Sequence, residues 1–120
     1  MSRPRILLAD SNESLLATVS ELLCEEFEIV AAVTTGKEAI RCTSETSPDL
    51  ILLDVVLDDM NGFELGNRLQ KLAPLAKVLY LSMYDGPAFV DAAFAAGALG
   101  YVFKAQAGSD LLTAIRSVCR

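Results

Sequence analysis

Short, uniformly apolar runs alternate with longer segments of mixed polarity along the whole chain. The run at 50–53 has the clearest boundaries, because Pro48 and Asp49 precede it and Asp54 follows it. Four consecutive apolar residues with such boundaries predict a strand that is buried on both faces. Comparable runs predict four further strands at 5–9, 27–33, 77–82 and 100–104. The first, third, fourth and fifth of these five strands deliver a polar side chain at their carboxyl ends.

The segments between the predicted strands carry apolar residues at helical spacing. The first segment places five of them on one face: Leu15, Leu16, Val19, Leu22 and Leu23. The third has a stripe that we expect to be buried: Leu65, Leu69 and Leu72. We expect four phenylalanines to belong to the core: Phe63, Phe89, Phe94 and Phe103. Five strands alternating with five helices predict an α/β fold, a doubly wound five-stranded parallel sheet.

Polar residues mark the expected helix starts. The expected caps are Ser11 or Asn12, Thr35 with Glu38, Asn61 with Glu64, and Gly108-Ser109-Asp110. Pro87 suits the first turn of the fourth helix. That helix, at 87–96, is rich in alanine and has few large apolar side chains, so we expect it to shift more easily than its neighbours.

Composition and charge narrow the function classes. The 120 residues, 52% of them hydrophobic, correspond to one domain spanning 1–120. The net charge of −6 opposes direct binding to nucleic acid or to an anionic membrane surface. Three separated cysteines without any histidine do not form a zinc motif, and no apolar run reaches membrane-spanning length. We therefore expect a cytoplasmic protein with reduced thiols.

Four polar residues that end strands are the candidate site: Asp10, Asp54, Ser82 and Lys104. Any one of them alone is most simply a cap, a turn residue or a solvated charge. In a parallel sheet, however, these ends lie along one edge, where such folds bind their ligands. Two carboxylates, a hydroxyl and an ammonium suit phosphoryl transfer to a carboxylate. Asp54 would be the nucleophile, Mg²⁺ would offset charge repulsion, and Lys104 and Ser82 would bind phosphoryl oxygens.

At these residues the sequence resembles the receiver domain of two-component response regulators, over essentially the whole chain. The matching motifs are Ile6-Leu7-Leu8-Ala9-Asp10, Leu52-Leu53-Asp54, Asn61-Gly62-Phe63-Glu64, Leu81-Ser82-Met83-Tyr84-Asp85 and the segment 97–104. The resemblance implies a flavodoxin-like fold with strand order 2-1-3-4-5. It also implies that Asp54 takes a phosphoryl group from a histidine kinase or a small phosphodonor, with self-phosphoryl transfer and slow autodephosphorylation as the only catalysis.

Ser82 followed by Met83-Tyr84-Asp85, with no proline after Lys104, looks most like the NarL/FixJ branch of this family. Members of that branch usually carry a carboxyl-terminal helix-turn-helix domain, so DNA would be contacted only through an output domain that is not in this chain. The resemblance also implies that Ser82 and Tyr101 act as a switch. They would repack the face made by the fourth helix, fifth strand and fifth helix, through which the chain could form a homodimer.

Ser11 departs from the family pattern, which usually has a second acid after the first strand. The expected metal ligands are therefore Asp10, Asp54, the backbone carbonyl of Val56, and Ser11 directly or through a water. Losing one carboxylate should cost at least about 10-fold in affinity, so we expect weak Mg²⁺ binding. We expect Asp58 and Asp59 to be exposed loop residues rather than substitute ligands.

Two alternatives stay open from the sequence. One is a degenerate receiver that serves as a phosphorylation-independent dimerisation or protein-interaction module. The other is a flavodoxin-like cofactor carrier. The cofactor-carrier alternative lacks support, because no Ser/Thr/Gly-rich phosphate loop follows the first strand and the chain has no tryptophan to stack on a flavin.

Overall fold

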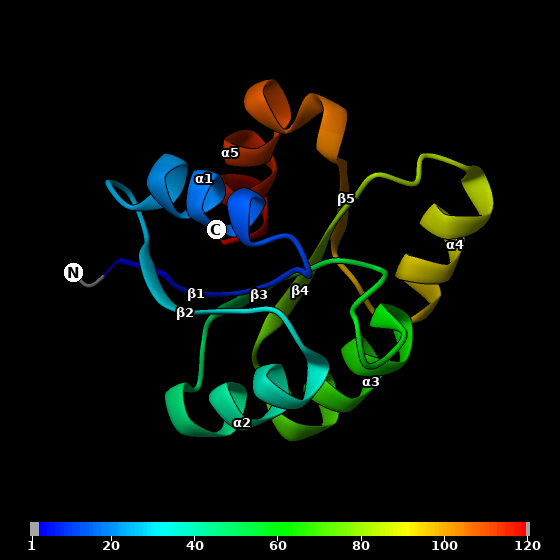
Figure 1. Cartoon of the computed structure of the whole chain (residues 1–120), viewed down its shortest axis with the longest axis horizontal. Coiled ribbons are helices and arrows are strands. Elements are labelled where there is room, and N and C mark those ends of the chain that lie inside the picture. Colours follow the sequence, from blue (N-terminus) through cyan, green and yellow to red (C-terminus); the bar gives the residue numbers. More distant parts are fainter. Residues whose placement is uncertain (1–2, 120) are drawn as a thin grey trace.

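A parallel five-stranded sheet with the order β2-β1-β3-β4-β5 forms the centre of the molecule (Figure 1). The computed structural model describes residues 3–119, so residues 1, 2 and 120 of the expected domain lie outside the described residues. The strands are β1 (Arg5–Ala9), β2 (Glu28–Val33), β3 (Leu50–Leu53), β4 (Lys77–Ser82) and β5 (Gly100–Phe103). The flavodoxin-like fold predicted from the sequence is confirmed. Phe27 and Lys104 lie just outside the strands in which they were expected.

Helices cover both faces of the sheet. They are α1 (Glu13–Leu23), α2 (Gly36–Thr46), α3 (Gly62–Leu72), α4 (Pro87–Ala95) and α5 (Ala107–Val118), with a 3-10 turn η1 (Lys104–Gln106) before α5. Figure 1 shows α1 and α5 together above the sheet, with α2 and α3 below it and α4 beyond the β5 edge. Within residues 3–119, no helix combines the length and the apolar character that crossing a bilayer requires.

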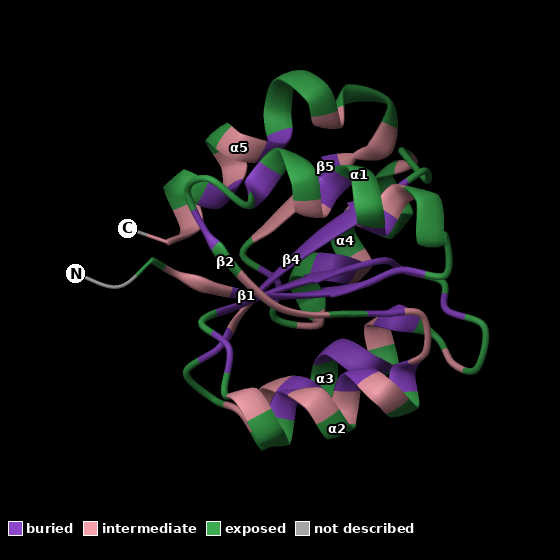
Figure 2. Cartoon of the chain, turned by 60° about the vertical axis from the view of Figure 1, so that its left-hand side comes forward, coloured by how far each residue is buried: buried purple, intermediate pink, exposed green. Residues whose placement is uncertain are grey.

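The central strands are buried on both sides, as Figure 2 shows by their colour. In β3, Leu50 and Leu52 face the α1 and α5 side, while Ile51 and Leu53 face the α2 and α3 side. Burying each of these side chains contributes roughly 2 kcal/mol. The prediction of a strand buried on both faces is therefore correct, and this strand holds Asp54 rigidly at its end.

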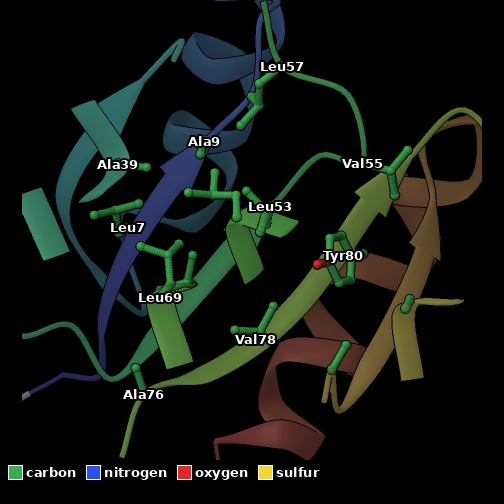
Figure 3. Close-up of a cluster of buried hydrophobic side chains, with 14 of the residues drawn as sticks. Leu7, Ala9, Ala39, Leu53, Val55, Leu57, Leu69, Ala76, Val78 and Tyr80 are labelled. Carbon is green, nitrogen blue, oxygen red and sulfur yellow. The ribbon is translucent and has the colours of Figure 1, made fainter. Parts of the chain in front are cut away.

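Tyr80 links β4 to the start of α3 from inside the core (Figure 3). Its hydroxyl is buried and donates a hydrogen bond of 2.8 Å to the carbonyl of Gly62. Its ring lies 5.4 Å from that of Phe63. Gly66 must lack a side chain, because a Cβ there would collide with the Tyr80 hydroxyl. Tyr80 thus fixes α3 next to the strand that ends at Ser82.

Several apolar residues that we expected in the core lie at the surface. Leu22 and Leu72 are 40% and 45% exposed in the last turns of α1 and α3. Phe89 and Phe94 are 37% and 49% exposed, because α4 buries only the small side chain of Ala93 against the sheet. The expectation that these two phenylalanines belong to the core is wrong.

The start of α5 also differs from the prediction. The helix begins at Ala107, so Ser109 and Asp110 lie inside its first turn rather than before it. Ser109 donates its hydroxyl to the carbonyl of Gln106 instead of accepting from the helix. The turn η1 places the helix start earlier than the Gly-Ser-Asp pattern indicated, because it continues directly from β5.

Candidate functional site

Three of the four predicted site residues make one ion-pair cluster at the carboxyl edge of the sheet. The Lys104 ammonium lies 2.8 Å from Asp10 Oδ2 and 3.0 Å from Asp54 Oδ2. Asp10 follows β1, Asp54 follows the neighbouring β3, and Lys104 follows β5, the edge strand. Both carboxylates are largely buried, with Asp54 only 6% exposed. The sheet therefore brings together groups that are 44 and 50 residues apart in the sequence.

The backbone orients both carboxylates. Asp10 Oδ1 accepts a hydrogen bond of 2.9 Å from the backbone N–H of Asn12. Asp54 Oδ1 accepts one of 2.7 Å from the N–H of Val55. In each acid, the main chain holds one oxygen while Lys104 binds the other. This arrangement fixes the direction in which each carboxylate points.

The surroundings of the cluster shift the pKa values of Asp54 and Lys104. Burial raises the pKa of the Asp54 carboxyl, and the nearby Asp10 charge raises it further, against the opposing effect of Lys104. Burial alone would disfavour the Lys104 ammonium, but its hydrogen bonds to Asp10 and Asp54 outweigh this and raise its pKa. The lysine therefore stays charged at neutral pH and compensates two closely placed acids.

Ser82 ends β4 and is fully buried beside the cluster. Its hydroxyl accepts a hydrogen bond of 3.0 Å from the N–H of Tyr84, and no hydrogen bond joins it to Asp10, Asp54 or Lys104. Tyr101 lies beside Tyr80 in register on β5, and its hydroxyl donates to the carbonyl of Tyr84 at 2.6 Å. Ser82 and Tyr101 thus both bond to Tyr84, the residue that leads into the loop before α4.

The residues expected to bind a metal could hold a divalent cation, with only two carboxylates among its ligands. Asp10 and Asp54 both reach the same Lys104 nitrogen, so a small cation could contact both. The antiparallel bridge of Val56 with Asn61 uses the carbonyls of Val55 and Met60, which leaves that of Val56 outside the bridge. Ser11 is exposed directly after Asp10. Over the described part of the chain, no three acids or cysteines converge on one point.

The loop between β3 and α3 starts at the site with Asp54 and ends at Gly62, which lies close to the Asp54 carbonyl. A Cβ at Gly62 would collide with the carbonyl of Asp54, so only glycine allows α3 to begin this close to the strand. Asn61 caps the helix as predicted, accepting from the N–H groups of Phe63 at 2.7 Å and Glu64 at 3.3 Å. The predicted third helix start is correct.

Asp59 has a role that sequence reasoning missed. It is exposed, as expected, but its two carboxylate oxygens accept hydrogen bonds from the first N–H groups of α2, from Gly36 at 2.7 Å and Lys37 at 3.1 Å. The Gly36 hydrogen bond is the main reason that the pKa of the Asp59 carboxyl is lowered. This cap spans 23 residues of sequence, so spacing along the chain carries no signal of it.

Comparison with known proteins agrees with this geometry. Residues 6–116 match the model of the response regulator receiver domain. Response regulator protein VraR of Staphylococcus aureus (strain NCTC 8325 / PS 47) is 34% identical over 97% of this chain and 56% of its own length. The chain thus spans about half the length of the curated relatives that it matches.

Solved structures agree as well. A LuxR-family two-component response regulator from Aurantimonas sp. SI85-9A1 superposes with a TM-score of 0.92, at 31% identity over 98% of this chain and 86% of that one. A CheY-like receiver domain protein from Methanospirillum hungatei JF-1 superposes with a TM-score of 0.88, at 30% identity over 97% and 93%. The resemblance inferred from the sequence is confirmed, including its LuxR/NarL-like branch. The chain belongs to the response regulator receiver domain family of two-component signalling.

Proposed function

We propose that Asp54 is the phosphoacceptor of this receiver domain. A sensor histidine kinase or a small phosphodonor would supply the phosphoryl group. One Asp54 oxygen would bond to phosphorus while the bond to the donor breaks, and the leaving group would keep that electron pair. The observation that carries this proposal is the Lys104 ammonium, held within hydrogen-bond distance of Asp54 and Asp10. It is positioned to neutralise negative charge that arrives at Asp54.

Lys104 and Ser82 would bind the transferred group. Lys104 now bonds to two carboxylates, and a phosphoryl oxygen on Asp54 would offer it a further anionic partner. Ser82 is buried at the end of β4, and its hydroxyl, which accepts from the Tyr84 N–H, also carries a proton that it would donate to a phosphoryl oxygen. These contacts strengthen as the phosphoryl group arrives, which is the requirement for stabilising the transfer.

Receiver domains generally bind Mg²⁺, and a structural neighbour, the CheX-CheY complex from Borrelia burgdorferi, contains BeF3 and Mg²⁺. Here Asp10, Asp54, the Val56 carbonyl and Ser11 would hold the ion. Its charge would offset repulsion between the phosphoryl oxygens and the two acids. Because this set has two carboxylates rather than three, we propose that binding is weak.

Replacing Ser11 by aspartate tests the weak-binding proposal. Ser11→Asp should tighten Mg²⁺ binding by about 10-fold or more, since it adds an anionic oxygen ligand beside Asp10. The dissociation constant can be followed by amide chemical shifts in a Mg²⁺ titration. Ser14→Asp, in the first turn of α1, is the control for a negative charge added nearby. Equal affinity in Ser11→Asp and the parent would place residue 11 away from the metal.

We propose that phosphorylation changes the face formed by α4, β5 and α5. Two copies of the chain would then associate through this face, and the change would control a DNA-binding output domain of the full-length protein. Met83, Phe94 and Leu99 on and beside α4 are 70%, 49% and 56% exposed, and Tyr84 stacks on Phe89 at 4.7 Å. An apolar surface of this kind is typical of an interaction site. A similar solved structure, a DNA-binding response regulator of the LuxR family from Staphylococcus aureus, supports a DNA-binding output domain.

Incubation with acetyl phosphate and Mg²⁺ tests the function. The parent should gain the mass of one phosphoryl group, while Asp54→Asn should gain none. Asp58→Asn is the matched control, because it neutralises an exposed acid of the same loop, and it should be modified like the parent. A parent that stays unmodified over a wide range of Mg²⁺ concentration would contradict the proposal and favour the phosphorylation-independent interaction module.

A further inference from the structure

We propose that Asp59 is a positioning residue for the phosphorylation site, which sets the Mg²⁺ affinity by tethering the β3–α3 loop (residues 54–61) to the start of α2. The inference rests on the proposed Mg²⁺-dependent phosphorylation of Asp54. It assigns a task to an exposed acid that is not itself placed among the metal ligands.

The tether is a bidentate contact with a helix end. The first N–H groups of an α-helix have no partner within the helix, and the helix dipole favours an anion there. Asp59 accepts from the N–H groups of Gly36 and Lys37, while Thr35 accepts from that of Glu38. The helix start is therefore completed by a side chain from a different part of the chain.

Met60 strengthens the same attachment. A Cβ at Gly36 would overlap the Met60 side chain, so the methionine lies directly against the backbone of the helix start. Two consecutive loop residues, Asp59 and Met60, thus bind one end of α2. The helix itself is anchored by Ala39, which is fully buried against the sheet.

These contacts fix the loop at both ends of the segment that carries Val56. At one end, Asp54 is held by β3 and by its bond to Val55. At the other end, the Asp59 tether closes the loop. Two backbone hydrogen bonds help: the Leu57 N–H donates to the Met60 carbonyl, and the Gly62 N–H donates to the Val55 carbonyl. Val56 is 49% exposed, so its side chain is held by packing less than those of the buried neighbours Val55 and Leu57. Its carbonyl is therefore held in position by the residues on either side.

A site with two carboxylates depends strongly on its neutral ligand. With two carboxylates in place of three, the Val56 carbonyl is a larger share of the protein ligands, and Mg²⁺ demands near-ideal octahedral geometry, so displacing this carbonyl should weaken binding. Removing a group that orients a ligand typically weakens metal binding by roughly 10- to 100-fold. We expect Asp59 to have an effect of this size although it does not contact the metal.

The test compares Asp59→Ala, Asp59→Asn and Asp58→Ala in Mg²⁺ titrations followed by amide chemical shifts. Asp59→Ala should raise the dissociation constant about 10-fold or more. Asp59→Asn keeps one carbonyl acceptor and should fall between Asp59→Ala and the parent. Asp58→Ala removes the same charge from the same loop without breaking the tether, so it should bind almost like the parent. Equal weakening by Asp58→Ala and Asp59→Ala would overturn the proposal, because charge alone would then explain it.

Hydrogen exchange gives a second readout that needs no metal. The amides of Gly36 and Lys37 should exchange faster in Asp59→Ala than in Asp58→Ala, and unchanged exchange would overturn the tether. If Asp59→Ala fails to fold, Asp59→Asn carries the same comparison. A parent that binds no Mg²⁺ would instead contradict the proposed function, so the two failures can be told apart.

Discussion

At the scale of single residues, the sequence predicts which side chains gather, but not how they bond. Asp10, Asp54, Ser82 and Lys104 are recognisable because each follows or ends a strand, and parallel strands place such residues along one edge. The simultaneous contact of Lys104 with both acids requires the positions of three strands, which no local pattern contains. Asp59 was missed for the same reason, since its partners are on α2.

Another acid makes the same point. Glu26 is an exposed acid shortly after α1, yet it forms a bidentate ion pair with Arg116 of α5, 90 residues away. The hydrogen bonds from Arg116 are the main cause of the lowered pKa of the Glu26 carboxyl. Charge composition alone could not indicate this pair, because its geometry depends on α1 and α5 lying side by side.

The buried charge of Asp54 leads to a prediction about stability and pH. The pKa of the Asp54 carboxyl is higher in the folded than in the unfolded state. Ionised Asp54 therefore lowers the free energy of unfolding at neutral pH, and this loss disappears when the pH falls below the pKa of the unfolded state. Asp54→Asn removes the charge and leaves Lys104 paired with Asp10, so it should raise the free energy of unfolding at pH 7. The gain should shrink as the pH falls to 4.

Urea unfolding of the parent and Asp54→Asn at several pH values measures this difference. Asp91→Asn, which alters an exposed acid inside α4 and away from its first turn, serves as the control and should show no such trend. A gain from Asp54→Asn that is constant between pH 7 and pH 4 would show that burial does not shift the Asp54 carboxyl.

At the scale of secondary structure, most boundaries followed from local chemistry. Asn12, Thr35 and Asn61 cap their helices as predicted, and Pro87 begins α4. The start of α5 could not be predicted, because η1 replaces a side-chain cap there. The need for glycine at the start of α3 was likewise invisible in the sequence, since it arises from the approach of Gly62 to the Asp54 carbonyl.

Two glycine substitutions separate crowding from helix propensity. Gly62→Ala should destabilise the protein by about 2 kcal/mol or more, because neither the helix nor the strand backbone can move away. Gly108→Ala, in α5 with open space around it, should stabilise by roughly 0.5–1 kcal/mol. Chemical denaturation measures both values. Similar effects of the two substitutions would contradict the close contact at Gly62.

At the scale of the whole molecule, the alternation of strands and helices was sufficient to predict the fold class, whereas the order 2-1-3-4-5 came from the family resemblance. The distribution of exposed apolar side chains was not predictable, because it depends on how little of α4 the sheet covers. That exposure is consistent with the expected ease of shifting α4. It also leaves Phe94 available to a partner.

The proposed homodimer face can be tested with one aromatic residue. Phe94→Asp should weaken self-association of the phosphorylated chain about 10-fold or more, the usual cost of losing a central interface aromatic. Leu22→Asp is the control, since Leu22 on α1 is 40% exposed but lies outside the face formed by α4, β5 and α5. Sedimentation equilibrium measures the association. Weakening by Leu22→Asp but not by Phe94→Asp would contradict the assignment.

The identity of the modified residue tests the central claim most directly. After treatment with acetyl phosphate and Mg²⁺, borohydride reduces an acyl phosphate to an alcohol and converts the aspartate that carried it into homoserine. Tryptic cleavage after Arg41 and Arg68 gives a peptide that contains Asp49, Asp54, Asp58 and Asp59. We predict homoserine at position 54 alone. Homoserine at another position, or in no peptide of a folded, Mg²⁺-loaded chain, would contradict the account.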